Sequence, residues 1–131
     1  MTVVLDWTAT EALASGAGNT HNIVGDLVER EVCYMAPAAV VAMYGTLYDK
    51  VSEQAAEYWL RVVAAGTDIR VMYEGDAEFL EDAGKAALVV DRLLATGFSA
   101  ALAKKLGVPL VTNIQSAAEF ARTGFCEVRF F

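Results

Sequence analysis

The sequence predicts an α/β fold in which helices cover both faces of one mostly parallel sheet of about five strands. Five short apolar segments are spread along the 131 residues, and longer segments whose apolar residues recur with helical spacing lie between them. No two of the apolar segments are joined by a short turn of the hairpin type. Strands that alternate with helices in this way form a parallel sheet between helical layers.

The length and composition fit a single domain over residues 1–131. A chain of 131 residues falls within the roughly 100–200 residues that one domain commonly has. Hydrophobic residues make up 56% and charged residues 21%, which excludes an intrinsically disordered chain. The net charge of −7 lacks the general basic character of nucleic-acid-binding proteins, so RNA binding is disfavoured, although a local basic patch stays compatible with it.

The first strand is predicted at Val3–Leu5, a short apolar run that suits a buried parallel strand. A helix follows it, and Thr8 or Thr10 can cap that helix. The segment 16–20 (GAGNT) lacks the lysine and the final glycine of phosphate-binding loops, so we interpret it as the end of this helix.

The remaining elements follow from the same patterns. Pro37 falls in a first helical turn, where proline is tolerated, and Gly66 and Gly107 each end a helix. The predicted helices are Thr20–Glu29, Ala36–Tyr48, Ser52–Ala65, Asp76–Leu94, Thr96–Leu106 and Ser116–Arg122, and the further strands are Val32–Met35, Ile69–Tyr73, Val108–Thr112 and Glu127–Phe131.

The sequence predicts a cytoplasmic protein without a membrane span. The opening residues have no basic region, and Asp6 interrupts the first apolar run, which is unlike a signal peptide. The longest uncharged run, Val32–Tyr48, is shorter than the roughly 20 apolar residues of a membrane-spanning helix. We therefore expect Cys33 and Cys126 to be buried thiols.

Polar residues follow two of the predicted strands. Asp6 and Thr8 come after the first strand and Thr112 ends the fourth, and parallel sheets place their sites at this carboxyl edge. Neighbouring hydroxyls and amides could form a neutral pocket for a small ligand or nucleotide, or act only as caps and turns. The candidate binding residues are Thr8, Thr96, Ser99, Thr112, Asn113 and Gln115.

Three stretches carry a pattern that is known from one family. They are residues 3–9 (VVLDWTA), residues 35–38 (MAPA) and residues 98–113 (FSAALAKKLGVPLVTN). Together they resemble the PIN-domain family, which includes the toxin ribonucleases of VapBC-type toxin–antitoxin pairs. The resemblance covers nearly the whole chain in element order, and it implies a three-layer α/β/α sandwich and a ribonuclease that uses Mg²⁺ or Mn²⁺.

In that family about four carboxylates hold the ion, because Mg²⁺ is a hard cation that takes oxygen ligands. The resemblance carries the first of these acids over to Asp6. None of the other three positions is acidic in this chain. They hold Met43, Thr96 and the pair Asn113–Ile114.

A shifted alignment does not supply the missing acids, because residues 32–48 and 92–118 contain no Asp or Glu. We therefore expect a degenerate PIN-like domain that holds no metal and needs no cofactor. Asp6 is then either a relic of a catalytic site or a structural carboxylate satisfied by its neighbours.

Three functions stay open at this point. The first is a non-catalytic domain that acts through protein–protein contacts, and the second is an Mg²⁺- or Mn²⁺-dependent ribonuclease of the VapC type. The third is a binding module for a small ligand or nucleotide at the carboxyl edge of the sheet. The missing acids favour the first.

Apolar helix surface predicts a homodimer. The run 32–48 is uncharged, and interface cores favour Tyr, Trp and Met. We expect the helices Ala36–Tyr48 and Ser52–Ala65 to form the contact, as the resemblance also implies. One set of side chains belongs either to this surface or to the core: Met35, Met43, Tyr44, Tyr48 and Trp59.

Two further features have a structural interpretation. His21 has no spacing typical of a triad or a metal site, so we expect a surface or capping residue. Lys104 and Lys105 end a predicted helix and suit its dipole.

Overall fold

The computed structural model describes residues 1–16 and 18–131, and its centre is a sheet of five strands in the order β3-β2-β1-β4-β5. Every pairing is parallel, which agrees with the prediction of a mostly parallel sheet. The elements are β1 (Thr2–Leu5), α1 (Trp7–Ser15), α2 (Gly18–Arg30), β2 (Val32–Met35), α3 (Pro37–Lys50), α4 (Glu53–Ala65), β3 (Ile69–Val71), α5 (Ala77–Val89), α6 (Leu94–Leu106), β4 (Leu110–Thr112), the 3₁₀ helix η1 (Gln115–Ala117), α7 (Ala118–Thr123) and β5 (Val128–Phe130).

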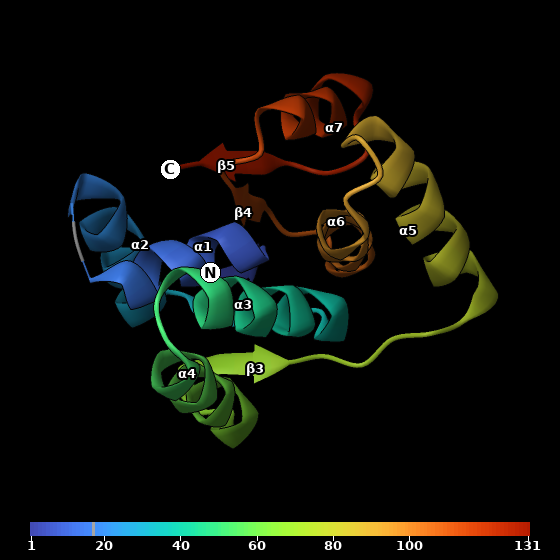
Figure 1. Cartoon of the computed structure of the whole chain (residues 1–131). Helices are drawn as coiled ribbons and strands as arrows, with labels where there is room; N and C mark the ends of the chain where they lie inside the picture. The colour runs from blue at the N-terminus through green and yellow to red at the C-terminus, as the bar shows by residue number, and fades with distance from the viewer. Residues whose placement is uncertain (17) are drawn as a thin grey trace.

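Helices cover both faces of the sheet. Val3 and Leu5 of the central strand pack with α1 to α4 in a first core cluster, whereas Val4 packs with α5 to α7 in a second core cluster. This alternation is the period of two that a strand buried on both faces requires. Figure 1 shows α5 and α6 on one side of the strands and α1 and α2 on the other. The predicted α/β/α sandwich is therefore confirmed.

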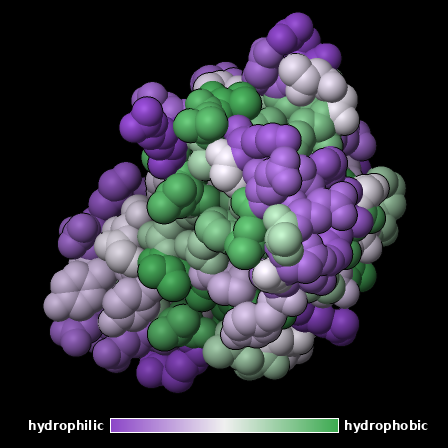
Figure 2. Space-filling view, turned by 90° about the vertical axis from the view of Figure 1, so that its right-hand side faces the viewer, coloured by the Kyte–Doolittle hydropathy of each residue, from purple (hydrophilic) through white to green (hydrophobic). Residues whose placement is uncertain are grey.

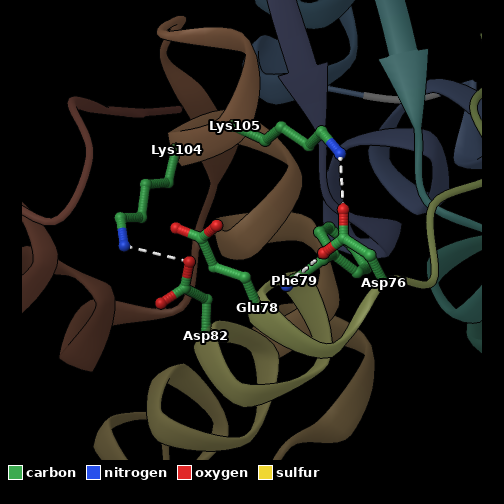
Figure 3. A pocket seen from close by; sticks show the side chains of 6 residues that line it. All are labelled: Asp76, Glu78, Phe79, Asp82, Lys104 and Lys105. Carbon is green, nitrogen blue, oxygen red and sulfur yellow. Dashed lines mark hydrogen bonds and ion pairs between the residues drawn. The ribbon is translucent and has the colours of Figure 1, made fainter.

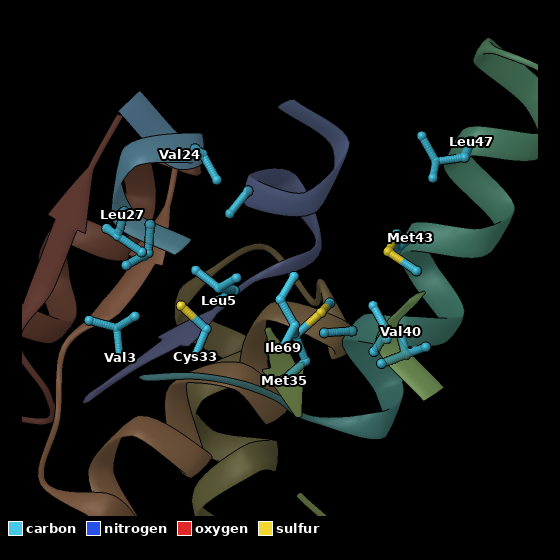
Figure 4. Packing of buried hydrophobic residues seen from close by; sticks show 14 of the residues in the cluster. Val3, Leu5, Val24, Leu27, Cys33, Met35, Val40, Met43, Leu47 and Ile69 are labelled. Atoms are coloured by element: carbon cyan, nitrogen blue, oxygen red, sulfur yellow. The ribbon is translucent and has the colours of Figure 1, made fainter. Parts of the chain in front are cut away.

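The first core cluster is built from long aliphatic and sulfur-containing side chains that point from the helices onto the sheet (Figure 4). Met35, Met43 and Leu47 are fully buried in it. Burying such a side chain contributes about 1.5–3 kcal/mol. Met35 and Met43 thus belong to the core, while Tyr44 and Trp59 are half-buried against it and Tyr48 is exposed.

The end of α5 differs from the prediction. The sequence predicts a helix to Leu94, but α5 ends at Val89, and Asp91 and Arg92 take left-handed conformations with φ of 57° and 63°. The amide of Arg92 donates to the carbonyl of Ala87 over 2.7 Å, which satisfies a carbonyl in the last turn of the helix. The chain reverses here because α6 packs back along α5.

The start of α1 also differs. Asp6 occupies the N-cap position, and neither Thr8 nor Thr10 caps the helix, because their hydroxyls bond elsewhere. Gly16 ends α1 with φ of 66°, as predicted, and α2 begins at Gly18. Of the interpreted segment 16–20, Ala17 lies outside the described residues.

The other helix signals agree with the sequence. The Ser52 hydroxyl accepts from the amide of Ala55 at the start of α4, and Gly66 and Gly107 are left-handed where α4 and α6 end. The ring of His21 donates from Nδ1 to the carbonyl of Leu13 over 2.9 Å, so this histidine caps the end of α1.

The two cysteines are free thiols. Cys33 is buried and Cys126 is half-buried, so the expectation of burial is met fully only by Cys33. Burial raises the pKa of Cys33 to about 11 and that of Cys126 to about 12. Within residues 1–16 and 18–131, no helix has the length and apolar character to cross a bilayer.

Candidate functional site

The carboxyl edge of the sheet brings Asp6 and Thr112 together. They end the neighbouring strands β1 and β4, and the amide of Asp6 donates to the carbonyl of Val111 over 3.0 Å. The first two turns of α6 cross above this point and add Thr96 and Ser99. Four side chains from three separate parts of the chain therefore meet at one place.

Three hydroxyls surround the Asp6 carboxylate. Thr96 and Thr112 each donate to Oδ2 over 2.9 Å, and Ser99 donates to Oδ1 over 3.1 Å. The Ser99 hydroxyl also lies 3.0 Å from the carbonyl of Ala95, so its single hydrogen serves one acceptor at a time. Both carboxylate oxygens thus have neutral donors from the chain itself.

A second row of hydrogen bonds supports the first. The Thr8 hydroxyl lies 3.3 Å from that of Thr112, and the amide of Asn113 donates to the Thr8 hydroxyl over 3.3 Å. Since Thr112 donates its hydrogen to Asp6, Thr8 is the donor to Thr112. The polar groups therefore form a chain that runs from the backbone to the carboxylate, and such chains strengthen each member.

The site is closed to solvent. Asp6, Thr96, Ser99 and Thr112 have no exposed surface, and Thr8 is 3% exposed. Burial raises the pKa of Asp6 above its ordinary value, although the hydroxyls and the backbone N–H of Trp7 act in the opposite direction. Burial makes it less favourable for this carboxyl group to ionise, and the hydrogen bonds from the three hydroxyls partly offset that effect.

Four of the six predicted binding residues gather here, and two do not. Thr8, Thr96, Ser99 and Thr112 lie around Asp6, whereas Asn113 and Gln115 are exposed beyond the end of β4. The Gln115 side chain donates to the carbonyl of Asn113 over 3.3 Å. A ligand at this edge does not reach the buried hydroxyls unless the site opens.

An open groove lies beside the buried site. Its volume is about 550 Å³, and it joins the start of α1, one face of α3 and the turn between α5 and α6. We call it the Trp7 groove. It is lined by Trp7, Ala42, Gly45, Thr46, Asp49, Lys50, Arg92, Leu93, Leu94 and Ala95.

The sequence interpretation missed this groove. One local signal was available, because Ala42, Thr46 and Asp49 recur along α3 at spacings of four and three and so share a face. The other wall has no such signal. Arg92 lines the groove from a turn in which its own backbone is left-handed, a conformation that the sequence does not predict for arginine.

No protein-family model and no curated protein sequence matches this chain. Solved structures do match it, over nearly the whole length of this chain and of theirs. VapC20 of Mycobacterium tuberculosis, a toxin that cleaves the sarcin–ricin loop, has a TM-score of 0.72 at 19% identity, with 97% of this chain and 98% of that chain covered. The chain has a VapC-like PIN-domain fold.

Two further solved structures are similar to this chain. The VapBC-1 structure of nontypeable Haemophilus influenzae gives a TM-score of 0.67 at 15% identity and covers 99% of this chain and 98% of that chain. The FitAcB structure of Neisseria gonorrhoeae gives 0.62 at 16% identity and covers 96% and 95%.

The PIN fold implies a divalent metal, and the donors around Asp6 do not fit one. Mg²⁺ takes oxygen ligands in a near-octahedral arrangement and is held by carboxylates. Here one carboxylate faces three hydroxyl donors, and the described residues contain no group of three or more His, Cys, Asp or Glu that could hold an ion.

The structure places the residues that align with the other family acids as follows. Met43 is fully buried in the first core cluster (Figure 4), and Thr96 is bonded to Asp6. Asn113 is exposed and Ile114 is half-buried. Among the residues that the structure describes, Asp49 on α3 is the single acid that lines the Trp7 groove.

Proposed function

We propose that this chain is a PIN-fold protein that acts through protein–protein contacts and carries out no metal-dependent catalysis. The observation that supports this most is the state of Asp6. Its two oxygens already accept from Thr96, Thr112 and Ser99 in a site without exposed surface. An ion would have to displace these donors and would gain a single carboxylate in return.

The partner that we propose is a small antitoxin-like protein. The similar solved structures include two that are named as VapBC, and VapBC pairs combine a toxin with an antitoxin. A chain that retained the fold and lost the metal would still have surfaces on which such a partner could bind. We therefore expect the partner to bind irrespective of Asp6.

A ribonuclease of the VapC type is the second candidate. The similar structures favour it, since VapC20 is named as a toxin that cleaves the sarcin–ricin loop. The retained Asp6 also fits it. For this function the Asp6 carboxylate would have to give up its hydrogen bonds to the three hydroxyls and bind a metal ion. Acids at positions other than those that align with the family's would have to supply the remaining ligands.

Metal binding and RNA cleavage separate the two candidates. Purified protein is titrated with Mn²⁺ by calorimetry into the low millimolar range, and a structured RNA is incubated with wild type, Asp6→Asn and Asp26→Asn. Asp26 is an exposed acid on α2, so its substitution matches the charge change away from the site. We expect no Mn²⁺ binding and no cleavage that depends on Asp6. Cleavage lost only in Asp6→Asn, together with Mn²⁺ binding by wild type, would establish the ribonuclease.

We also propose that the chain forms a homodimer through α3 and α4. Val41 is 72% exposed and Tyr73 is 78% exposed beside an apolar hollow of about 190 Å³. Figure 2 shows the face on the right-hand side of Figure 1, where hydrophobic side chains form a band bordered by hydrophilic ones. Apolar surface of this kind marks an interaction site in a water-soluble domain, and a two-fold pairing is the commonest way to cover it.

A further inference from the structure

Three adjoining hollows meet at one side chain on the opposite layer of the sandwich. They lie between α5, the end of α6 and the segment from α7 to β5, with volumes of about 240, 250 and 210 Å³. Lys104 lines all three, so we call the whole depression the Lys104 groove. It is separate from Asp6 and from the Trp7 groove, which share none of its lining residues.

Aromatic rings form the apolar part of the groove. Phe79 lines the first hollow, Phe120 and Phe125 line the second, and Phe125 continues into the third. Phe120 and Phe125 pack with ring centroids 5.3 Å apart. Phe79 and Phe120 are themselves buried, so half-buried Phe125 and the 40% exposed Val89 offer the apolar surface against which a partner's side chain can pack.

Carboxylates on α5 face the same space. Glu78 and Asp82 are four residues apart, so they share a face of the helix and repel each other. In Figure 3 the Glu78 carboxylate points into the hollow towards α6, and among the described residues it has no ion pair. Lys105 does not neutralise the charge of Glu78, because its ammonium forms ion pairs with Glu74 over 2.7 Å and with Asp76 over 3.3 Å.

Lys104 occupies the place where a partner's cation would fit. Its ammonium lies 2.9 Å from Asp82 Oδ2 and 5.2 Å from the centroid of the Phe125 ring. A carboxylate combined with an aromatic face is a general arrangement for binding a cationic side chain. The Lys104 side chain is 41% exposed, and ion pairs at such positions contribute little, so another cation can displace it at low cost.

We infer that the Lys104 groove is a docking site for a segment of a partner protein that carries an arginine between apolar side chains. The guanidinium is planar and presents several donors, so it can bond Glu78 and Asp82 together and stack on Phe125. Apolar neighbours of the arginine pack on Phe125 and Val89. The net charge of −7 of the chain favours a cationic partner over a nucleic acid. This inference does not rest on the proposed function.

A short probe peptide tests the groove. The blocked tripeptide Leu-Arg-Leu is titrated into ¹⁵N-labelled protein, and its uncharged citrulline analogue serves as the peptide control. We expect chemical-shift changes confined to the backbone amides of residues 76–90, 101–108 and 118–127, and none of comparable size with the citrulline peptide. Shifts spread evenly over the acidic surface would overturn the inference.

Two pairs of variants then test the mechanism. Glu78→Gln with Asp82→Asn is expected to weaken binding about fivefold, as the loss of a partly exposed charge pair does, whereas the same charge change at Asp26 and Glu29 on α2 leaves it unchanged. Lys104→Met is expected to tighten binding about fivefold, because it removes the ammonium group that competes with the arginine for Asp82 and Phe125. Lys50→Met, which breaks the comparable pair with Glu11, is its control. Equal effects at the groove and at the control positions would show non-specific charge attraction and refute the site.

Discussion

Thr96 donates its hydroxyl to Asp6 Oδ2 over 2.9 Å, and this bond joins the first turn of α6 to the end of the central strand β1. The two residues are 90 positions apart, and neither has exposed surface. Two of the three donors to Asp6 come from α6. The carboxylate therefore acts as a buried anchor between the sheet and the second helical layer.

Replacing Thr96 with valine tests this anchor. Valine keeps the shape of threonine and removes the donor, so Oδ2 is left with Thr112 alone. We expect the free energy of unfolding to fall by about 1–3 kcal/mol, since a buried charged acceptor loses a hydrogen bond. Urea denaturation measures the change. Thr123→Val, at an exposed position on α7, is expected to stay within about 0.5 kcal/mol of wild type.

The pH dependence of Asp6→Asn follows from the raised pKa of Asp6. Burial is the largest cause of that rise, so the folded protein holds this proton more tightly than the unfolded chain. Wild type then loses stability as pH rises from the unfolded value of 3.8 through the folded pKa, and the loss is complete above it. Asparagine does not titrate. The stability of Asp6→Asn relative to wild type is therefore expected to increase from pH 4.5 to pH 8 in parallel urea titrations. A relative stability that decreases over this range would mean that the hydroxyls outweigh burial.

Gly97 permits the close packing of α5 and α6. A Cβ atom at this position would lie 2.7 Å from the carbonyl oxygen of Ala83 and 2.8 Å from Cβ of Ala87. The helices would have to separate, so we expect Gly97→Ala to cost about 1–3 kcal/mol. Gly84 on α5 is exposed, and a Cβ there meets nothing within 4 Å. Gly84→Ala should instead stabilise the protein by up to about 1 kcal/mol in the same denaturation experiment.

The proposed homodimer predicts a mass of about twice 14.0 kDa by light scattering. Val41→Lys places a charge at the apolar hollow and should give a monomer that remains folded by circular dichroism. Val51→Lys introduces the same charge at the other end of α3, where Val51 is also exposed, and should leave the dimer intact. A wild-type monomer at high concentration, or equal dissociation by both variants, would contradict this interface.

The sequence by itself determined the elements and their order. Val3, Val4 and Leu5 are apolar on both faces, which requires helices on both sides of the strand, and Gly66 and Gly107 end helices through a backbone conformation that glycine adopts freely. It also located Asp6 and Thr112 at the carboxyl edge. All of these signals are local, because each depends on residues within a few positions of one another.

The tertiary structure decided what is non-local. Nothing in the local sequence ends α5 at Val89, since Asp91 and Arg92 adopt left-handed conformations without glycine and are held there as α6 packs onto α5. The direction of the Thr96 hydroxyl was equally open, because a polar residue near a helix start can cap, face water or face the core. It points to Asp6 because α6 lies over the end of β1, where a buried carboxylate needs donors. Contacts between residues 90 positions apart depend on packing that no short spacing in the sequence encodes.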